Sequence, residues 1–192
     1  QKNSRINNEN GGGKMKKVEL KVDVINQLVL YRTATFKDKL AFLDEDVQNA
    51  QRAGAKNVWI ETDLSTRQIR IKNDGVVLDD PQNLFTMAES GWDEDIKENE
   101  NPFGLGFFSN ISVSPIVEIV SGEYHIIFDV DRVISERNPE AIEINQLDSP
   151  QDGFELVLRE FDFDQIYPYY IYERVETLGK YAQGVTVYYN GT

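Results

Sequence analysis

The feature that most constrains the fold of this chain is a short glycine motif near its middle, Phe103-Gly104-Leu105-Gly106-Phe107. Two glycines one residue apart leave the backbone without Cβ atoms, so that a ligand can approach it closely. The apolar run that follows, residues 105–113, predicts a helix whose free N–H groups would face the same point. The motif has the outline of a phosphate-binding loop, although a glycine pair of this kind also occurs in plain turns.

A second candidate element is a predicted helix over residues 36–53, which ends at Gly54. Its apolar residues share one face: Phe36, Leu40, Leu43, Val47 and Ala50. Glu45 and Asn49 lie one turn apart on the other side, separated by about 40° around the helix axis. A carboxylate can accept a proton from an attacking water, and an amide oxygen can bind Mg²⁺. On an arbitrary helix the same two residues usually belong to a solvated face.

A third element is the predicted strand 68–72, which runs into the turn Asn73-Asp74-Gly75. The two polar residues supply hydrogen-bonding side chains, and the glycine permits a ligand or another backbone to approach closely. Leu78 follows on an apolar segment. The same three residues are also ordinary chemistry for a turn between a strand and a loop.

In their order along the chain, these elements resemble the GHKL ATPase superfamily, which comprises gyrase B, the ninety-kilodalton heat-shock chaperones, sensor histidine kinases and MutL. The N-terminal ATPase domain of the chaperones is the most similar branch. Residues 101–109 are similar to its glycine box, and residues 84–91 to the beginning of its lid. Residues 153–158 and 185–188 are similar to the end of that domain, so the resemblance covers residues 18–189.

The resemblance implies Mg²⁺-dependent binding of ATP and its slow hydrolysis to ADP and phosphate. It gives Glu45 the role of the general base that activates water, and Asn49 the role of the Mg²⁺ ligand. Residues 90–101 would form a short lid. The other implied nucleotide contacts belong to the base pocket and the glycine box: Asn73, Gly75, Leu78, Asn83, Phe103, Gly104, Leu105, Gly106 and Phe107.

Four residues depart from the family pattern. Asn73 replaces an Asp that receives the adenine amino group, which costs roughly 1–2 kcal/mol because the charge-assisted part is lost. Asp74 compensates only if the turn is rotated. Val77 and Asn101 replace glycines, and Phe154 replaces a Thr that supports the water network around the base. These departures leave open an alternative, a non-catalytic interaction module with a degenerate nucleotide pocket.

Composition narrows the class of protein and its partners. The 192 residues, of which 40% are hydrophobic, predict one globular domain over residues 15–192 behind a disordered linker or tag, residues 1–14. The resemblance implies that this domain binds ATP. A net charge of −13 disfavours direct binding of nucleic acid by this domain. The absence of a long apolar run or a signal peptide predicts a cytoplasmic protein, and the absence of cysteine rules out disulfides and thiolate metal sites.

The pattern of elements predicts an α+β fold with a mostly antiparallel sheet and helices on one face. The resemblance implies that this fold is a Bergerat-type two-layer sandwich. Strands are expected over residues 18–22, 57–62, 68–72, 117–120, 124–130, 141–146, 154–159 and 186–189. Helices are expected over residues 24–31, 36–53, 80–89, 105–113 and 166–183. Ser121-Gly122 would turn the chain between two of the strands.

The resemblance also has consequences for partners. In this superfamily the domain often acts as a nucleotide-gated clamp that receives a catalytic lysine from a following domain. The expected partners are therefore ATP and ADP, together with a second copy in a nucleotide-dependent homodimer or a larger, chaperone-like host protein. A protein-kinase-like phosphotransferase is disfavoured because the sequence shows no phosphoacceptor helix, and His125 lies in a strand pattern.

Overall fold

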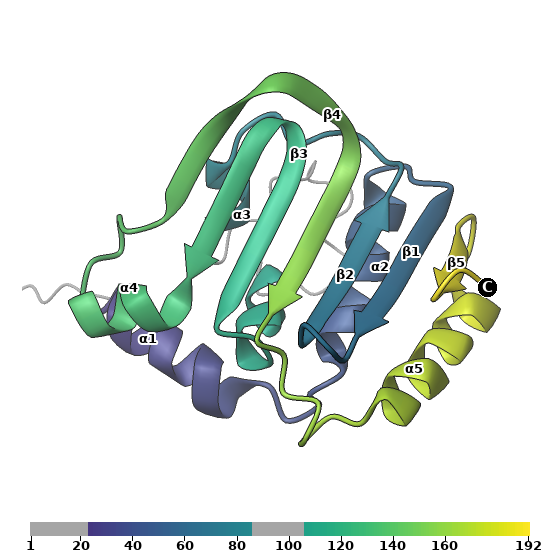
Figure 1. Ribbon diagram of the computed structural model, residues 1–192, viewed down its shortest axis with the longest axis horizontal. Coiled ribbons are helices and arrows are strands. Elements are labelled where there is room, and N and C mark those ends of the chain that lie inside the picture. The colour runs from purple at the N-terminus through teal and green to yellow at the C-terminus, as the bar shows by residue number, and fades with distance from the viewer. Residues whose placement is uncertain (1–22, 86–105) are drawn as a thin grey trace, which may run out of the picture.

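A five-stranded open sheet with helices packed on it organises the computed structural model, which describes residues 23–85 and 106–192 (Figure 1). The strands are β1 (Asn57–Asp63), β2 (Gln68–Asn73), β3 (Ile116–Asp129), β4 (Glu143–Arg159) and β5 (Thr186–Tyr189). Their order is β3-β4-β2-β1-β5, and every neighbouring pair is antiparallel except β1 and β5. The predicted α+β class with a mostly antiparallel sheet is confirmed.

The second layer is helical. It contains α1 (Val24–Leu30), a π-helix η1 (Tyr31–Thr35), α2 (Ala41–Arg52), α3 (Gln82–Phe85), a 3-10 helix η2 (Phe107–Ser112), α4 (Val130–Glu136) and α5 (Pro168–Tyr181). In Figure 1, α2 lies behind β1 and β2, and α5 flanks the β5 edge of the sheet. This arrangement gives a two-layer sandwich.

Buried apolar and more exposed polar side chains alternate along the strands, and the apolar side chains mark the face of the sheet that the helices cover. Val58 and Ile60 of β1 are fully buried, as is Ile69 of β2, and they point toward the helices. The residues between them, such as Glu61 and Arg70, point to the opposite face, because successive side chains of a strand alternate. The core therefore lies between the sheet and the helices, and Leu43 and Val47 of α2 are among its buried residues.

The helix α2 begins later than its apolar pattern predicts. Phe36 is extended, with φ −94° and ψ 102°, and the carboxylate of Asp38 accepts a hydrogen bond from the N–H of Leu40 at 2.9 Å. This bond holds a turn ahead of the helix, which is why residues 36–40 stay outside it. The helix ends as predicted beside Gly54, whose φ of +71° favours glycine.

The predicted turn at Ser121-Gly122 is present, but it lies inside one continuous strand, β3, which doubles back there (Figure 1). Both halves of β3 pair with the same partner, since Ser121 lies opposite Phe154 and Tyr124 opposite Gln146 in β4. Gly122, with φ +55°, lies between two register shifts, and β4 uses more residues than β3 to pass this point because it follows the outside of the turn. After the turn, the N–H of Val130 donates to the carbonyl of Pro115 at 2.9 Å, so the end of β3 lies beside its beginning. The helix α4 was not predicted; Asp129 caps it by accepting a hydrogen bond from the N–H of Arg132 at 2.9 Å.

Some sequence predictions lie outside the described residues. These are the linker at residues 1–14, the strand at residues 18–22 and the second half of the helix at residues 80–89. The described first half of that helix is α3. The predictions for β1, β2 and β5 agree with the structure to within one residue at each end.

Gly153 offers a test of how closely β4 approaches β2. Its φ is +72°, and a Cβ there would overlap the backbone oxygen of Asn73. Gly184 is the matched control, because its φ is +74° but a Cβ would meet nothing within 4 Å. We expect urea unfolding to show that Gly184→Ala lowers the free energy of unfolding by about 1 kcal/mol, from backbone strain alone. Gly153→Ala should lower it by about 3 kcal/mol or more, because its Cβ also overlaps β2. Equal losses would show that β4 moves away from Asn73 without cost.

Candidate functional site

The candidate site is centred on a close approach between Glu45 of α2 and Gly106. A Cβ on Gly106 would lie 2.5 Å from Glu45 Oε2 and 3.6 Å from Glu45 Cβ. Any side chain at position 106 would therefore displace the carboxylate. The structure brings together the residue predicted to be the general base and the last glycine of the predicted phosphate-binding motif.

The local sequence fixes the backbone around Gly106. Its carbonyl accepts hydrogen bonds from the N–H of Ser109 at 3.0 Å and from Ser109 Oγ at 2.6 Å. Ser112 Oγ bonds in the same way to the carbonyl of Ser109, at 2.7 Å. These short bonds to the third residue back favour a tight 3-10 helix over the predicted α-helix. Phe108 and Ile111 anchor this helix in the core.

A buried polar pair joins the two sides of the site. Asp46, the residue after Glu45, accepts a hydrogen bond on Oδ1 from Asn110 Nδ2 at 3.2 Å. The same amide nitrogen donates to the carbonyl of Phe107 at 3.1 Å. Asp46 is 9% exposed and Asn110 is fully buried. Within the described part of the chain, Asp46 Oδ2 and Asn110 Oδ1 have no hydrogen-bond donor.

The environment of Asp46 disfavours its charge. Burial raises the pKa of Asp46 to about 7; the hydrogen bond from Asn110 opposes this rise, and the nearby charge of Glu45 adds to it. Neither Asp46 nor Asn110 is among the site residues predicted from the sequence. The burial of Asp46 could have been predicted from its spacing, because it lies three residues after Leu43 and four before Ala50, on the buried face of the helix.

Asn49 is half-buried one turn after Glu45, as predicted from the spacing. Its side-chain oxygen, the atom that would bind a metal, accepts a hydrogen bond from Arg52 Nη1 at 3.2 Å. Among residues 23–85 and 106–192, no group of three or more His, Cys, Asp or Glu side chains is placed to hold a metal ion. An Mg²⁺ ion there would depend on Asn49, the phosphates and water, a coordination that suits this metal.

The turn after β2 packs against the end of α2. Asn73 is 5% exposed, and its side-chain oxygen accepts a hydrogen bond from the N–H of Gly75 at 3.0 Å. A Cβ on Gly75 would lie 2.8 Å from the carbonyl oxygen of Ala53, so glycine is needed for this contact. The N–H of Val76 also donates to that oxygen, at 2.9 Å. The turn is therefore held beside the helix that carries Glu45.

Asp74 does not replace the missing carboxylate at position 73. Its Oδ1 accepts hydrogen bonds from the backbone N–H groups of Lys56 at 2.7 Å and Asn57 at 2.9 Å. Bonds from the backbone and side chain of Asn57 hold the pKa of Asp74 below its usual value. Its role is to secure the start of β1. Val77 is not among the described residues with positive φ, so the lost glycine causes no backbone strain.

Two further predicted contacts flank this turn. Leu78 is partly buried, and its N–H donates to Ser121 Oγ at 2.9 Å; that hydroxyl donates to the carbonyl of Gly153 at 2.6 Å. Ser121, at the turn of β3, thereby ties the segment after β2 to β3 and β4. Asn83 on α3 is exposed, and its amide bonds to Asp79 at 3.3 Å. Its N–H donates to the carbonyl of Asp80 at 3.1 Å, and neither Asp79 nor Asp80 is a predicted site residue.

The rest of the glycine box lies outside the described residues, namely Asn101, Phe103, Gly104, Leu105 and the lid at 90–101. Phe107 lies inside and is partly buried. Its ring meets that of Phe85 edge to face, with centroids 5.5 Å apart. Phe85 also contacts Phe128 of β3 at 5.4 Å. The positions that flank residues 86–105 on either side are therefore joined through aromatic packing.

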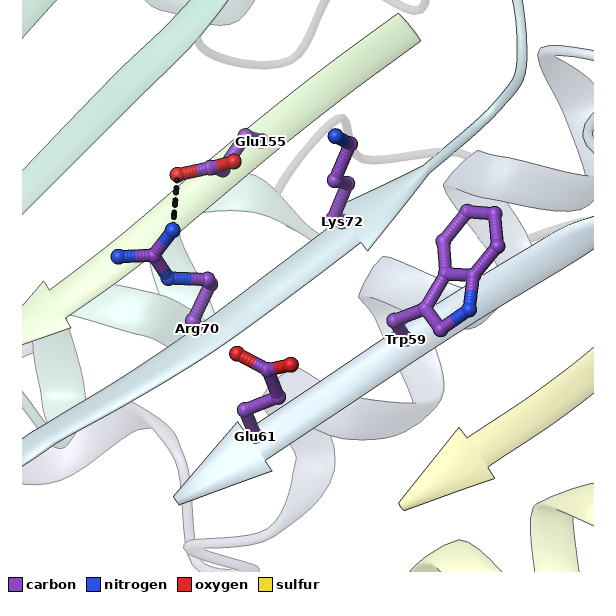
Figure 2. A pocket seen from close by; sticks show the side chains of 5 residues that line it. All are labelled: Trp59, Glu61, Arg70, Lys72 and Glu155. Carbon is purple, nitrogen blue, oxygen red and sulfur yellow. Dashed lines mark ion pairs between the residues drawn. The ribbon is translucent and has the colours of Figure 1, made fainter. Parts of the chain in front are cut away.

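A shallow hollow of about 340 Å³ lies on the opposite face of the sheet. Figure 2 shows its lining residues, which are Trp59, Glu61, Arg70, Lys72 and Glu155. Arg70 and Glu155 form an ion pair at 3.0 Å across β2 and β4. This hollow is separated from Glu45 by the whole sheet, so it is distinct from the predicted nucleotide site.

No family model matches this chain, and no curated protein sequence matches it either. Over residues 23–85 and 106–192, no helix is long and apolar enough to cross a membrane.

Asp46 gives the site a pH-dependent contribution to stability. Because its folded pKa is about 7 and the ordinary value is 3.8, the native state holds the proton more tightly. The stabilisation is complete below about pH 4 and is lost as the pH rises to about 7. One pKa unit corresponds to roughly 1.4 kcal/mol. Between pH 5 and pH 8, the free energy of unfolding measured in urea should therefore fall by about 2–3 kcal/mol more for wild type than for Asp46→Asn. Parallel pH profiles of the two proteins would contradict this.

Proposed function

We propose that this chain binds Mg·ATP and slowly hydrolyses it to ADP and phosphate. The observation that carries the proposal is the approach of Glu45 to Gly106, because it pairs a carboxylate with the one glycine of the motif that the structure describes. The half-buried position of Asn49, one turn further along α2, supports it. The chain would act as a nucleotide-gated module of a larger protein or assembly, or of a nucleotide-dependent homodimer.

In the proposed reaction, water attacks the γ-phosphorus and Glu45 accepts its proton while ADP leaves. Backbone N–H groups of the glycine motif would hold the phosphate oxygens, since glycine lets the chain approach them closely. Bound Mg²⁺ would neutralise the charge that develops on these oxygens. Asn49 would hold the metal after its side-chain oxygen exchanges the bond from Arg52 for the ion.

Base recognition is expected to be weak. The side-chain oxygen of Asn73 already accepts a hydrogen bond from Gly75, and Asp74 is bonded to the start of β1. Neither oxygen is therefore well placed to receive an adenine amino group. These bonds favour the second candidate function, a non-catalytic interaction module. The two candidates differ in a simple observation, since only the first predicts that millimolar Mg·ATP raises the melting temperature.

Binding tests the role of Asn49. Titration calorimetry should detect Mg·ATP binding to the wild-type protein and a loss of at least about tenfold in affinity for Asn49→Ala, because one metal ligand is removed. Gln48→Ala is the matched control, since Gln48 is the exposed neighbour on the same helix. Identical heats for wild type and Asn49→Ala would contradict the assignment. Absence of heat and of thermal shift in the wild type would favour the interaction module.

Turnover tests the role of Glu45. Phosphate release by Glu45→Gln should fall by about 100-fold or more while Mg·ATP binding is kept, because only the proton acceptor is lost. Gly106→Ala should also slow turnover, since its Cβ would displace the carboxylate. Gly179→Ala on α5 is the control glycine, where a Cβ meets nothing within 4 Å. Unchanged turnover in Glu45→Gln would remove Glu45 from the reaction.

A further inference from the structure

We propose that Asp46 and Asn110 are positioning residues, whose buried hydrogen bond sets the distance between Glu45 and the backbone at Gly106. The inference rests on the proposed ATPase function, in which both of those groups act. Neither member of the pair would touch the nucleotide. They would act through the two elements that they join, α2 and η2.

The connectivity of the pair supports this role. Asp46 follows Glu45 directly, so that a shift of one moves the backbone of the other. Asn110 donates both to Asp46 and to the carbonyl of Phe107, the residue after Gly106. One amide nitrogen therefore links the helix that carries the carboxylate to the backbone that the carboxylate faces. A change of a few tenths of an ångström in this link is transmitted to a contact that already leaves no room for a Cβ.

The energetics argue against a purely structural role. Each member of the pair has a buried oxygen, Asp46 Oδ2 and Asn110 Oδ1, without a donor among the described residues. Burying a polar atom without a partner costs free energy, whereas a pair of apolar residues of similar size is often neutral or stabilising. Apolar residues that follow or precede the pair in the sequence, Phe108 and Ile111 on η2 and Val47 on α2, are fully buried or nearly so. Leucines would pack here with less cost.

What the pair adds over apolar packing is direction. Apolar contacts tolerate sliding of one helix along another, while a hydrogen bond fixes both the distance and the angle between its groups. Catalytic groups must be held within about 0.5 Å of their productive geometry, so such a bond matters more for the rate than for stability. The Asp46–Asn110 hydrogen bond therefore lowers stability where α2, which carries Glu45, meets η2, which follows Gly106.

The test separates the rate from binding and folding. Asp46→Leu/Asn110→Leu replaces the pair by apolar side chains. We expect this double variant to fold with a melting temperature at or above that of wild type and to bind Mg·ATP with a Kd within about threefold. Its kcat should fall by about 10- to 100-fold, as expected for a small misplacement of the base. Asp46→Asn keeps an oxygen that can accept from Asn110, and it should restore kcat to within about threefold of wild type.

Val47→Ala is the matched control, because Val47 is the buried neighbour of Asp46 on α2 and makes no hydrogen bond to η2 through its side chain. It should lower the melting temperature but leave kcat within about threefold of wild type. Should the double leucine variant fail to fold, Asp46→Ala replaces it. For this variant too, kcat should fall by about 10- to 100-fold while the Kd for Mg·ATP stays within about threefold of wild type.

Each outcome has a distinct meaning. A wild-type kcat in the double variant, or a kcat in Val47→Ala as low as in the double variant, would overturn the positioning role and leave the proposed function intact. If the wild-type protein binds Mg·ATP, but every variant loses affinity for it by the same factor as it loses kcat, the positioning role is also overturned. A wild-type protein that neither binds nor hydrolyses Mg·ATP would overturn the proposed function, and the positioning role with it.

Discussion

The missing Cβ of Gly106 is the constraint on which the geometry of the candidate site depends. It allows the backbone to lie directly against the Glu45 carboxylate, which a side chain would push aside. Everything around it maintains this approach: Ser109 closes the backbone turn, and η2 packs into the core beside α2. The site is a joint between two elements that lie far apart in the sequence. Its geometry depends on long-range packing, because neither element could form it alone.

The layers of the fold could be predicted because their signals are local. Alternation in β1 and β2, for example at Ile69 and Ile71, marks a strand with one covered face, and the apolar stripe of α2 marks a helix on a sheet. The course of β3 could be predicted only in part. The Ser121-Gly122 turn is a local signal, and the positive φ of Gly122 fits it. The single long β4 that pairs with both halves of β3 could not be predicted, because this pairing joins residues far apart in the sequence.

Within the site, the sequence predicted which residues share a helix face, but it did not predict the hydrogen-bond partners of their side chains. The spacing of Glu45 and Asn49 is a local property of a helix. By contrast, the oxygen of Asn73 is bonded to Gly75, and that of Asn49 to Arg52, because of rotamers that only the packed structure selects. Asp46 was missed for a related reason: a carboxylate at a core position is normally excluded, and its partner Asn110 comes from another element.

The two faces of the sheet are expected to evolve at different rates. On the helix side, Asn73 and Ser121 are bound to neighbours that leave little room for other side chains. On the open side, residues such as Trp59 and Lys72 border a shallow hollow and meet solvent, so a replacement there need not disturb the backbone. Relatives of this chain should therefore diverge first across the open face. A comparison weighted toward the helix-facing positions should detect distant ancestry for longer than one that counts all residues equally.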